Sequence, residues 1–549
     1  MQADIDFNSM QKIIDNVKAN DRIIFALIFI LAIPAFLIHL GYMPVMFGTD
    51  EPRRALVALE MLISKDYITP TLNGELYFNK PPLYNWIILA FYKITGNTSS
   101  LVLRLPMILA LAGFSFTIFY FLRKHFDRLF SLLVVGMVLT CGRILFYDSM
   151  LGLIDICFSL IAFTMFMMVY HYAKKEKYWH LFLLTYMLTA LGFLMKGLPA
   201  VVFLGITYLT YFISEKKFKK LFLPQHFVGI ALFIIIIGSY YWAYNLKHPD
   251  SLSTIASTIF NESSKRTVAS FGIWPTILHL FTFPFEAIYH FLPWSLGILL
   301  CIRKGFFKDL NANPFVKYCA LIFIFNILIY WSSVEVYARY LIMFCPLIFT
   351  VFAYNFKCLE EKNQWKLKTL EWIFVVASFI LLLSFIAIPF IDSLRSLGIP
   401  YFYVKVIILI GMAVAIIYLM LKIPVKRMIF FVLILLVARI GFDWFILPHR
   451  LKDSGFDVLH KNLVEIGEMT KGHTLLLTRN ANFRDAETFY IEDTRREMLR
   501  VVEKIEDYNA FYIAGQDDLV GKNYRIIKEF HVECTKLKAF LVKFEKKTP

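Results

Sequence analysis

Apolar residues along this chain fall into long runs separated by short polar loops. Many of the runs approach twenty residues, the length that an α-helix needs to cross the hydrocarbon core of a bilayer. The pattern therefore predicts an α-helical polytopic membrane protein with about thirteen transmembrane helices. They are expected near residues 23–41, 105–121, 129–147, 150–173, 179–195, 197–213, 226–246, 287–302, 316–334, 338–356, 369–390, 401–421 and 428–447.

The loops between these runs alternate in charge. One set is short and dense in lysine and arginine, as in residues 174–177, 216–220 and 422–427. Loops of this kind face the cytoplasm. The alternation places the N-terminus in the cytoplasm and the C-terminal part of the chain outside. The first run, 23–41, is too long for a cleaved signal peptide and indicates a retained anchor.

Two long outer loops, about 42–104 and 247–286, are too apolar to be free solvated loops. Over residues 52–65 apolar positions recur at helical spacing among charged ones, which predicts an amphipathic helix in the membrane interface. Residues 83–92 are apolar but short for a span, and Tyr84, Trp86 and Tyr92 suit the headgroup level. We expect these loops to fold down as a roof over a cavity.

The pattern changes near residue 450. Short strands are expected at 474–478, 510–514, 524–529 and 539–544, and helices at 459–469 and 493–505. This predicts a small C-terminal α/β soluble domain over 450–549, after a membrane domain over 1–449. No catalytic motif is visible in the C-terminal part.

Composition supports the membrane class. Hydrophobic residues make up 58% of the chain, and the formal net charge is +16. A soluble protein with that charge would suggest nucleic acid, but here the basic cytoplasmic loops account for it. Of seven cysteines, Cys534 alone falls in the C-terminal domain, so no disulfide framework is expected there. No cluster with zinc spacing is visible.

The first outer loop carries two adjacent carboxylates, Asp50 and Glu51, at the start of the predicted interfacial helix. Acidic residues there can simply cap the helix and favour its dipole. The functional interpretation is a general base that takes a proton from an attacking hydroxyl or phosphate. Arg53 and Arg54 would keep that base ionised. Both interpretations stay open on the sequence.

Lys80 lies about thirty residues downstream, in the run Asn79-Lys80-Pro81-Pro82. The prolines hold the chain rigid and exclude a position in the middle of a helix. A lysine fixed at headgroup height is suited to a phosphate, which it meets as a point charge. An ordinary interfacial lysine is the alternative.

Other ionisable residues stand at the outer ends of predicted spans, where charge is costly and its placement informative. Asp148 and Asp155 are seven residues apart and could share one helix face. Lys196 lies between two spans. Arg339 opens a span and could hold a phosphate bidentately.

Simpler roles remain for several charged residues. A single lysine or arginine at the end of a span often snorkels to the interface. Glu262 and Arg266, four residues apart in the second outer loop, could form a local ion pair. Arg439 and Asp443 are also four apart, and we expect them to pair structurally.

Several short motifs resemble those of a known family. They occur in the order Thr49-Asp50-Glu51-Pro52-Arg53, Asn79-Lys80-Pro81-Pro82-Leu83-Tyr84, Arg104-Leu105-Pro106, Arg143 with Asp148, Met195-Lys196-Gly197 and Arg339-Tyr340. Together they resemble the GT-C membrane glycosyltransferases, specifically relatives of the protein O-mannosyltransferases and of the lipid A aminoarabinose transferase. The resemblance covers about residues 20–350, and the remaining spans by topology only. It implies an inverting transfer of sugar from a polyprenyl phosphate.

The resemblance also implies roles for individual residues. Asp50 matches the family's catalytic acidic position, and Asp148 its second acidic position. The expected site comprises the catalytic carboxylates Asp50, Glu51 and Asp148, the donor-phosphate residues Arg53, Lys80, Lys196, Arg266 and Arg339, and the further cavity residues Tyr84, Arg104, Asp155, Glu262 and Tyr340.

One departure from the family concerns metal. The aminoarabinose transferase holds zinc with a Glu before its Lys-Pro-Pro and a His in the second outer loop. This chain has Asn79 and Ser263 at those places. No metal site is therefore expected from these residues, although a divalent metal stays open, and no other cofactor is expected. The sugar and its acceptor stay open as well.

The sequence thus predicts a polyprenyl-phosphate-sugar-dependent glycosyltransferase of the bacterial inner membrane, with its C-terminal domain in the periplasm. Its expected partners are the donor lipid and a lipid, glycan or protein acceptor of the cell envelope, and not nucleic acid. The alternative is a transporter or flippase of a lipid-linked or anionic solute. Binding groups near the bilayer midplane and inverted repeats would favour it, and neither is visible. A scaffold whose C-terminal domain binds a partner is a third possibility.

Overall fold

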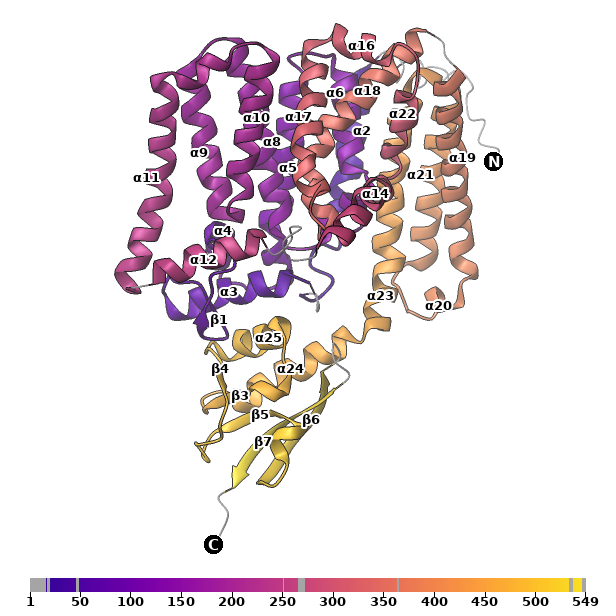
Figure 1. The fold of residues 1–549 in the computed structure, drawn as a ribbon. Coiled ribbons are helices and arrows are strands. Elements are labelled where there is room, and N and C mark those ends of the chain that lie inside the picture. Colours follow the sequence, from indigo (N-terminus) through magenta and orange to yellow (C-terminus); the bar gives the residue numbers. More distant parts are fainter. Residues whose placement is uncertain are drawn as a thin grey trace.

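The computed structural model describes residue 16 and residues 20–45, 49–249, 251–264, 272–362, 365–532 and 537–545. A bundle of long helices forms one part, and a small α/β domain sits against one end of it (Figure 1). Within the described residues, nine helices are long and apolar enough to cross a membrane, or ten if the bent pair Arg128–Leu139 and Gly142–Met150 is one span. The protein is therefore a multi-pass membrane protein with a C-terminal α/β domain, as the sequence predicts.

The helices follow the predicted spans closely. They are α2 (Asp21–Leu37), α5 (Ser100–Leu122), α6 (Arg128–Leu139), α7 (Gly142–Phe146), α8 (Ile154–Lys174), α9 (Tyr178–Lys196), α10 (Pro199–Ser214), α11 (Pro224–Lys247), α17 (Pro314–Trp331), η4 (Ala338–Phe344), α18 (Cys345–Glu361), α19 (Trp365–Ala387), α21 (Phe402–Lys422) and α22 (Arg427–Gly441). Apolar length decides these elements, because the backbone of a spanning segment must satisfy its own hydrogen bonds.

The span predicted at 287–302 is wrong as a single helix. The chain forms α14 (Ile273–His290), a cis Leu292–Pro293 bond, the 3-10 turn η3 (Trp294–Leu296) and the short α15 (Gly297–Cys301) before α16 (Phe306–Ala312). Pro293 has no N–H to donate, so it interrupts the helical ladder within the apolar run. The prediction counted apolar residues and missed this break.

The expected common helix for Asp148 and Asp155 is also wrong. α6 and α7 are bent by 53° at residues 140–141, and Asp148 lies in the 3-10 turn η1 (Asp148–Met150). Residues Leu151 and Leu153 are extended, so Asp155 starts afresh in the first turn of α8. The two carboxylates therefore belong to different elements.

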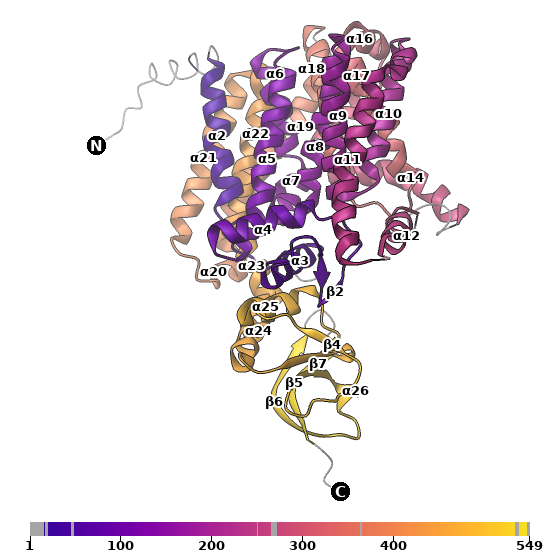
Figure 2. The ribbon, with the colours of Figure 1, turned by 90° about the vertical axis from the view of Figure 1, so that its left-hand side faces the viewer.

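A layer of shorter helices covers the end of the bundle that faces the C-terminal domain (Figure 2). It contains α3 (Glu51–Ser64), the hairpin of β1 (Thr71–Leu72) and β2 (Glu75–Leu76), α4 (Leu83–Thr95) and α12 (Ser251–Ser264). Pro52 occupies the first turn of α3, where a missing N–H costs nothing. The roof expected from the two outer loops is thus made of α3, α4 and α12.

The polar side of α3 is covered rather than solvated. Glu51, Arg54 and Glu60 are buried. The sequence predicted an amphipathic helix in the membrane interface. The predicted helix is confirmed as α3, and it packs against α25 (Asp485–Arg495) of the C-terminal domain.

The C-terminal domain begins without a break in the helix. α22 continues through Phe442–Ile446 into α23 (Leu447–Ser454), so the expected boundary near 450 falls inside α23. α24 (Phe456–Thr470) and α25 pack beside a five-stranded sheet of order β4-β3-β5-β7-β6. Its strands are β3 (Leu475–Thr478), β4 (Arg500–Val502), β5 (Phe511–Gly515), β6 (Asn523–Val532) and β7 (Leu537–Glu545).

The first three strands of this sheet are parallel, and β7 pairs antiparallel with β5 and β6. The four expected strands and the helix at 459–469 are confirmed. The helix expected at 493–505 is wrong, because Arg496 adopts φ 58 and ends α25. The Leu499 N–H donates to Glu492 at 2.8 Å, and β4 follows. Buried apolar residues of α24 and α25 join the same hydrophobic core as those of the bundle.

Candidate active site

Four charged side chains meet where the roof joins the bundle. Arg339 Nη2 lies 2.5 Å from Asp50 Oδ2, and Arg339 Nε lies 3.3 Å from Asp155 Oδ2. Lys196 Nζ lies 2.6 Å from Asp155 Oδ1. These four residues are far apart in the sequence, where each was predicted separately. In the structure they form one network of alternating charge.

Local structure fixes each member of this network. Asp50 immediately precedes α3, Arg339 lies in the first turn of η4, Asp155 in the first turn of α8, and Lys196 ends α9. A carboxylate at a helix start and an ammonium at a helix end both suit the helix dipole. Gly197 follows at φ 84 and ψ −146, a conformation that side chains rarely adopt, and turns the chain directly after the lysine.

The network runs from an open surface into the protein. The exposed fraction is 50% for the side chain of Asp50, 14% for Arg339, 7% for Lys196 and 5% for Asp155. Asp50 makes no capping hydrogen bond to the backbone of α3. It is therefore the member of the network that an incoming substrate can reach, and capping does not explain it.

Aromatic rings enclose the cations. Lys196 Nζ lies 3.9 Å from the ring centre of Tyr340, and the guanidinium of Arg339 lies 4.3 Å from that of Tyr337. Tyr84 is fully buried and its hydroxyl has no hydrogen-bond partner among the described residues. Burial raises the pKa of Tyr84 well above its usual value, so its hydroxyl is a neutral donor.

Glu51 points away from Asp50. Its two oxygens accept from Arg104 Nε at 2.7 Å and Nη2 at 2.9 Å, and Oε1 also accepts from the Gly152 N–H at 2.6 Å. Arg104 further donates to the carbonyls of Leu40 and Met43, each at 2.9 Å. Glu51 and Arg104 are both buried. This pair ties the loop before α3 to the bundle.

Asp148 is engaged elsewhere. It accepts from Arg143 Nε at 3.0 Å and from Nη2 at 2.7 Å, and its side chain is 2% exposed. The expected structural pair of Arg439 and Asp443 is confirmed at 2.9 Å, with both side chains buried. Asp148 is nevertheless near enough for its charge to act on Arg339 of the Asp50 network.

The remaining candidates take several places. Arg53 donates from Nε to Asp485 Oδ2 at 2.9 Å, and its Nη1 lies 4.0 Å from Asp50 Oδ1. Lys80 is partly buried just before α4, near enough for its charge to act on Asp155. Glu262 is partly buried in α12. Arg266 lies outside the described residues.

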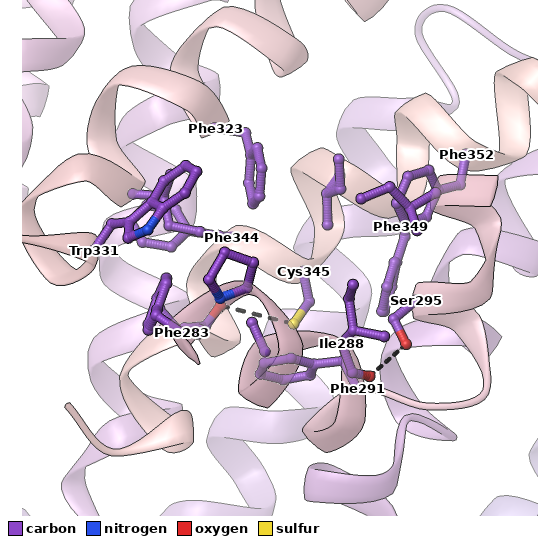
Figure 3. A pocket seen from close by; sticks show the side chains of 16 residues that line it. Phe283, Ile288, Phe291, Ser295, Phe323, Trp331, Phe344, Cys345, Phe349 and Phe352 are labelled. Atoms are coloured by element: carbon purple, nitrogen blue, oxygen red, sulfur yellow. Dashed lines mark hydrogen bonds between the residues drawn. The ribbon is translucent and has the colours of Figure 1, made fainter. Parts of the chain in front are cut away.

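An apolar groove begins two residues after Arg339 in the chain, and Figure 3 shows the side chains that line it. Its cavity volume is about 200 Å³, and it lies between α14, α17 and the helix of η4 and α18. Its wall begins at Leu341, directly after Tyr340, and continues along one helix face through Phe344, Ile348 and Phe352. Ser295 donates to the Ile288 carbonyl at 2.6 Å, so its hydroxyl is already satisfied.

The sequence predicted a cavity but not this groove. Its walls come from segments far apart in the chain, and the apolar pattern of each segment is that of an ordinary span. Within the described residues, no group of three or more His, Cys, Asp or Glu side chains is arranged to hold a metal ion.

Comparisons with a family model and with solved structures both agree with the resemblance to the GT-C membrane glycosyltransferases that the motifs predict. Residues 79–242 match the family described as dolichyl-phosphate-mannose-protein mannosyltransferase. The chain shares its fold with ArnT from Cupriavidus metallidurans bound to undecaprenyl phosphate, at 15% identity and a TM-score of 0.69, over 94% of this chain and 97% of that one. The apo state of the same ArnT gives a TM-score of 0.67 at the same identity and coverage. The resemblance expected from the motifs is thus confirmed.

One curated relative is an uncharacterized protein of Aquifex aeolicus, which is 25% identical over 280 residues. The match covers 50% of this chain and 54% of that protein. The chain therefore spans about half the length of the curated relative that it matches.

Proposed function

We propose that this protein transfers a monosaccharide from a polyprenyl phosphate to a cell-envelope acceptor at the outer face of the bacterial inner membrane. One observation carries the proposal. The half-exposed carboxylate of Asp50 is held by the partly buried cation Arg339, and the apolar groove begins two residues beyond that arginine. The site thus offers a base, a phosphate-binding cation and a channel for a hydrocarbon chain side by side.

The prenyl chain and the phosphate of the donor lipid each have a separate binding region in this proposal. The prenyl chain lies in the groove, whose walls are apolar and whose polar groups are already satisfied (Figure 3). The ArnT with the same fold is described as bound to undecaprenyl phosphate. The phosphate then lies at the mouth, near Arg339, Lys80 and Arg53. Arginine meets phosphate as a planar fork and lysine as a point charge.

Donor binding prepares Asp50 for chemistry. Arg339 contacts both Asp50 and Asp155. A donor phosphate competes with Asp50 for this guanidinium and leaves Asp50 freer to accept a proton. Asp155 and Lys196, both buried, keep Arg339 in place during the exchange. The catalytic base thus becomes available when the donor is bound.

The transfer step then follows from the placement of charge. The acceptor hydroxyl gives its proton to Asp50 and attacks the anomeric carbon from the face opposite the phosphate. The new C–O bond forms as the bond to the phosphate oxygen breaks, which inverts the anomeric centre. Arg339, Lys80 and Arg53 neutralise the charge that develops on the departing polyprenyl phosphate.

The other predicted carboxylates support this site without reacting. Both oxygens of Glu51 accept hydrogen bonds from buried groups, and Asp148 is held bidentately by Arg143. We therefore assign Glu51, Arg104 and Asp148 to the framework. The membrane orientation follows the basic loops, which lie at the end of the bundle opposite the C-terminal domain and indicate the cytoplasmic side.

Sugar release by the purified protein tests the proposal. The full chain in lipid is offered a panel of polyprenyl-phosphate monosaccharides and cell-envelope acceptors. Wild type is expected to form product, and Asp50→Asn is expected to form none. Asp392→Asn is the matched control, because that carboxylate is 89% exposed in α20 (Asp392–Arg395) at the same end of the bundle. Product formation by Asp50→Asn at the wild-type rate would remove Asp50 as the base.

The transporter alternative makes a different prediction in the same preparation. Absence of turnover with every donor, together with movement of the labelled carrier between the leaflets of vesicles, would overturn the enzyme and favour the flippase.

A further inference from the structure

The C-terminal domain contacts the segment that carries Asp50 on both sides of that residue. Before it, the Val45 N–H donates to the Tyr490 hydroxyl at 2.5 Å. After it, Arg53 Nε donates to Asp485 Oδ2 at 2.9 Å. Tyr490 and Asp485 both belong to α25. One helix of the C-terminal domain therefore holds the acidic loop at two points.

The contact to Arg53 extends the charged network into the C-terminal domain. In order, the charges are Asp485, Arg53, Asp50, Arg339, Asp155 and Lys196, and their signs alternate throughout. The successive closest contacts are 2.9, 4.0, 2.5, 3.3 and 2.6 Å. Asp485 ends the series at the first position of α25, and its side chain is only 18% exposed.

Arg53 depends on Asp485 for its orientation. Its side chain is 38% exposed, and its contact with Asp50 at 4.0 Å is too long for a hydrogen bond. The hydrogen bond to Asp485 uses Nε and so directs the terminal nitrogens toward Asp50. Burial lowers the pKa of Arg53, but Asp485, Tyr77 and Asp50 together outweigh it and raise the pKa, with Asp485 contributing most of the rise.

We infer that Asp485 of the C-terminal domain is a positioning residue for the transfer reaction, acting through Arg53 on Asp50 and the donor phosphate. The inference rests on the proposed function. It makes the C-terminal domain part of the site, although its sequence carries no catalytic motif. An arginine fixed before the donor arrives loses less freedom on binding than one that must be ordered by the phosphate.

Steady-state kinetics of the full chain in lipid test this role. Asp485→Asn keeps the size of the side chain and removes its charge. We expect kcat/KM for the donor to fall by about tenfold to a hundredfold, the range seen when a supporting group is lost. KM for the acceptor and the melting temperature should stay close to wild type. Asp485→Glu should recover most of the loss.

The matched control is Asp493→Asn. Asp493 lies on the same helix and accepts a hydrogen bond from Thr98 of the membrane domain, away from Arg53. It tests whether any weakened contact between the domains reduces turnover. We expect this variant to transfer sugar at nearly the wild-type rate. Equal losses in Asp485→Asn and Asp493→Asn would overturn the positioning role and leave only domain docking.

A double-mutant cycle isolates the path through Arg53. Once Arg53→Ala is present, Asp485→Asn should cost little more, because the group that it positions is gone. Additive losses would overturn the inference. If Asp485→Asn does not fold, Arg53→Lys replaces it, since lysine keeps the charge and loses the Nε–H donor. Wild-type turnover by Arg53→Lys would overturn the inference in the same way.

The wild-type protein separates this inference from the proposed function. If wild type and Asp485→Asn transfer sugar at equal rates, the positioning role is refuted and the proposed function is unaffected. If wild type transfers sugar from none of the donors, the proposed function is refuted, and so is the inference that rests on it.

Discussion

Neutralising Asp50 or its neighbour Glu51 should have opposite consequences. Glu51→Gln removes a buried charge that is bonded to Arg104 and to the Gly152 N–H. Asp50→Asn removes a half-exposed charge that is bonded to Arg339. The first change should damage the fold and spare the chemistry of molecules that do fold. The second should spare the fold and abolish the chemistry.

The contacts set the size of the two effects. Removing one partner of a buried ion pair costs about 3–5 kcal/mol, because the other charge stays buried without compensation. Glu51→Gln should lie in this range, since the exposed fraction is 0% for the Glu51 side chain and 1% for Arg104. An exposed pair contributes about 0–1 kcal/mol. Asp50→Asn should therefore destabilise by no more than about 1 kcal/mol.

Two measurements on the same preparations separate these effects. Melting of the detergent-solubilised protein, followed by size-exclusion chromatography, reports stability. Sugar transfer per folded molecule reports chemistry. Glu51→Gln should melt well below wild type and yield less monodisperse protein, with near-normal transfer per folded molecule. Asp50→Asn should melt with wild type and transfer nothing.

Arg104→Met is the matched control for the pair, because it strands Glu51 instead of Arg104 and should lower the melting temperature as Glu51→Gln does. A wild-type melting temperature for Glu51→Gln would refute the assignment of Glu51 to the framework. So would a greater loss of stability in Asp50→Asn than in Glu51→Gln.

Further predictions concern the cation, the groove and the domain interface. Lys196→Met removes the ammonium group that contacts the buried Asp155 beneath Arg339. It should weaken donor binding, as measured by titration with polyprenyl phosphate. Ile348→Trp narrows the groove and should raise KM for long-chain donors but not for donors of one or two isoprene units. Burial raises the pKa of Glu60 to about 7 and that of Glu492 well above its usual value. The folded protein thus keeps protons that the unfolded chain releases near pH 4.5, so its melting temperature should fall between about pH 4.5 and 7, less so in Glu60→Gln.

The spans could be predicted from the sequence because apolar length alone decides them. The break at Pro293 was missed because the surrounding run is as apolar as an unbroken span, although the proline itself is a signal for it in the sequence. α25 ends where Arg496 adopts a left-handed conformation, and the hydrogen bond from the Leu499 N–H to Glu492 holds the chain as it leaves the helix. Local pattern carries no signal for that contact.

The members of the site could be named from the sequence, but not their arrangement. Asp50 and Glu51 are adjacent, yet neighbouring residues at a helix start point about 100° apart, so one reaches the open cavity and the other the core. Asp155, Lys196 and Arg339 meet because the start of α8, the end of α9 and the start of η4 lie at the same level of the bundle. Asp485 carried no signal at all, since its role depends on how the C-terminal domain docks.

The alternation of charge explains how a site beside a lipid groove can hold an ionic reaction. The charges of Asp50, Asp155 and Asp485 balance those of Arg53, Arg339 and Lys196, so these six side chains together are neutral. Lys80 adds one positive charge, which the single negative charge of a sugar phosphodiester cancels. After transfer, the departing monophosphate ester carries a second negative charge, while Asp50 has gained the acceptor proton and lost its own.

The total charge of the site is therefore the same before and after the transfer. Charge separation in a low-dielectric environment is costly, so a path that moves charge between adjacent groups without creating net charge has a lower barrier. Such a path requires the base and the phosphate-binding cations to be neighbours. The contact between Asp50 and Arg339 meets that requirement directly.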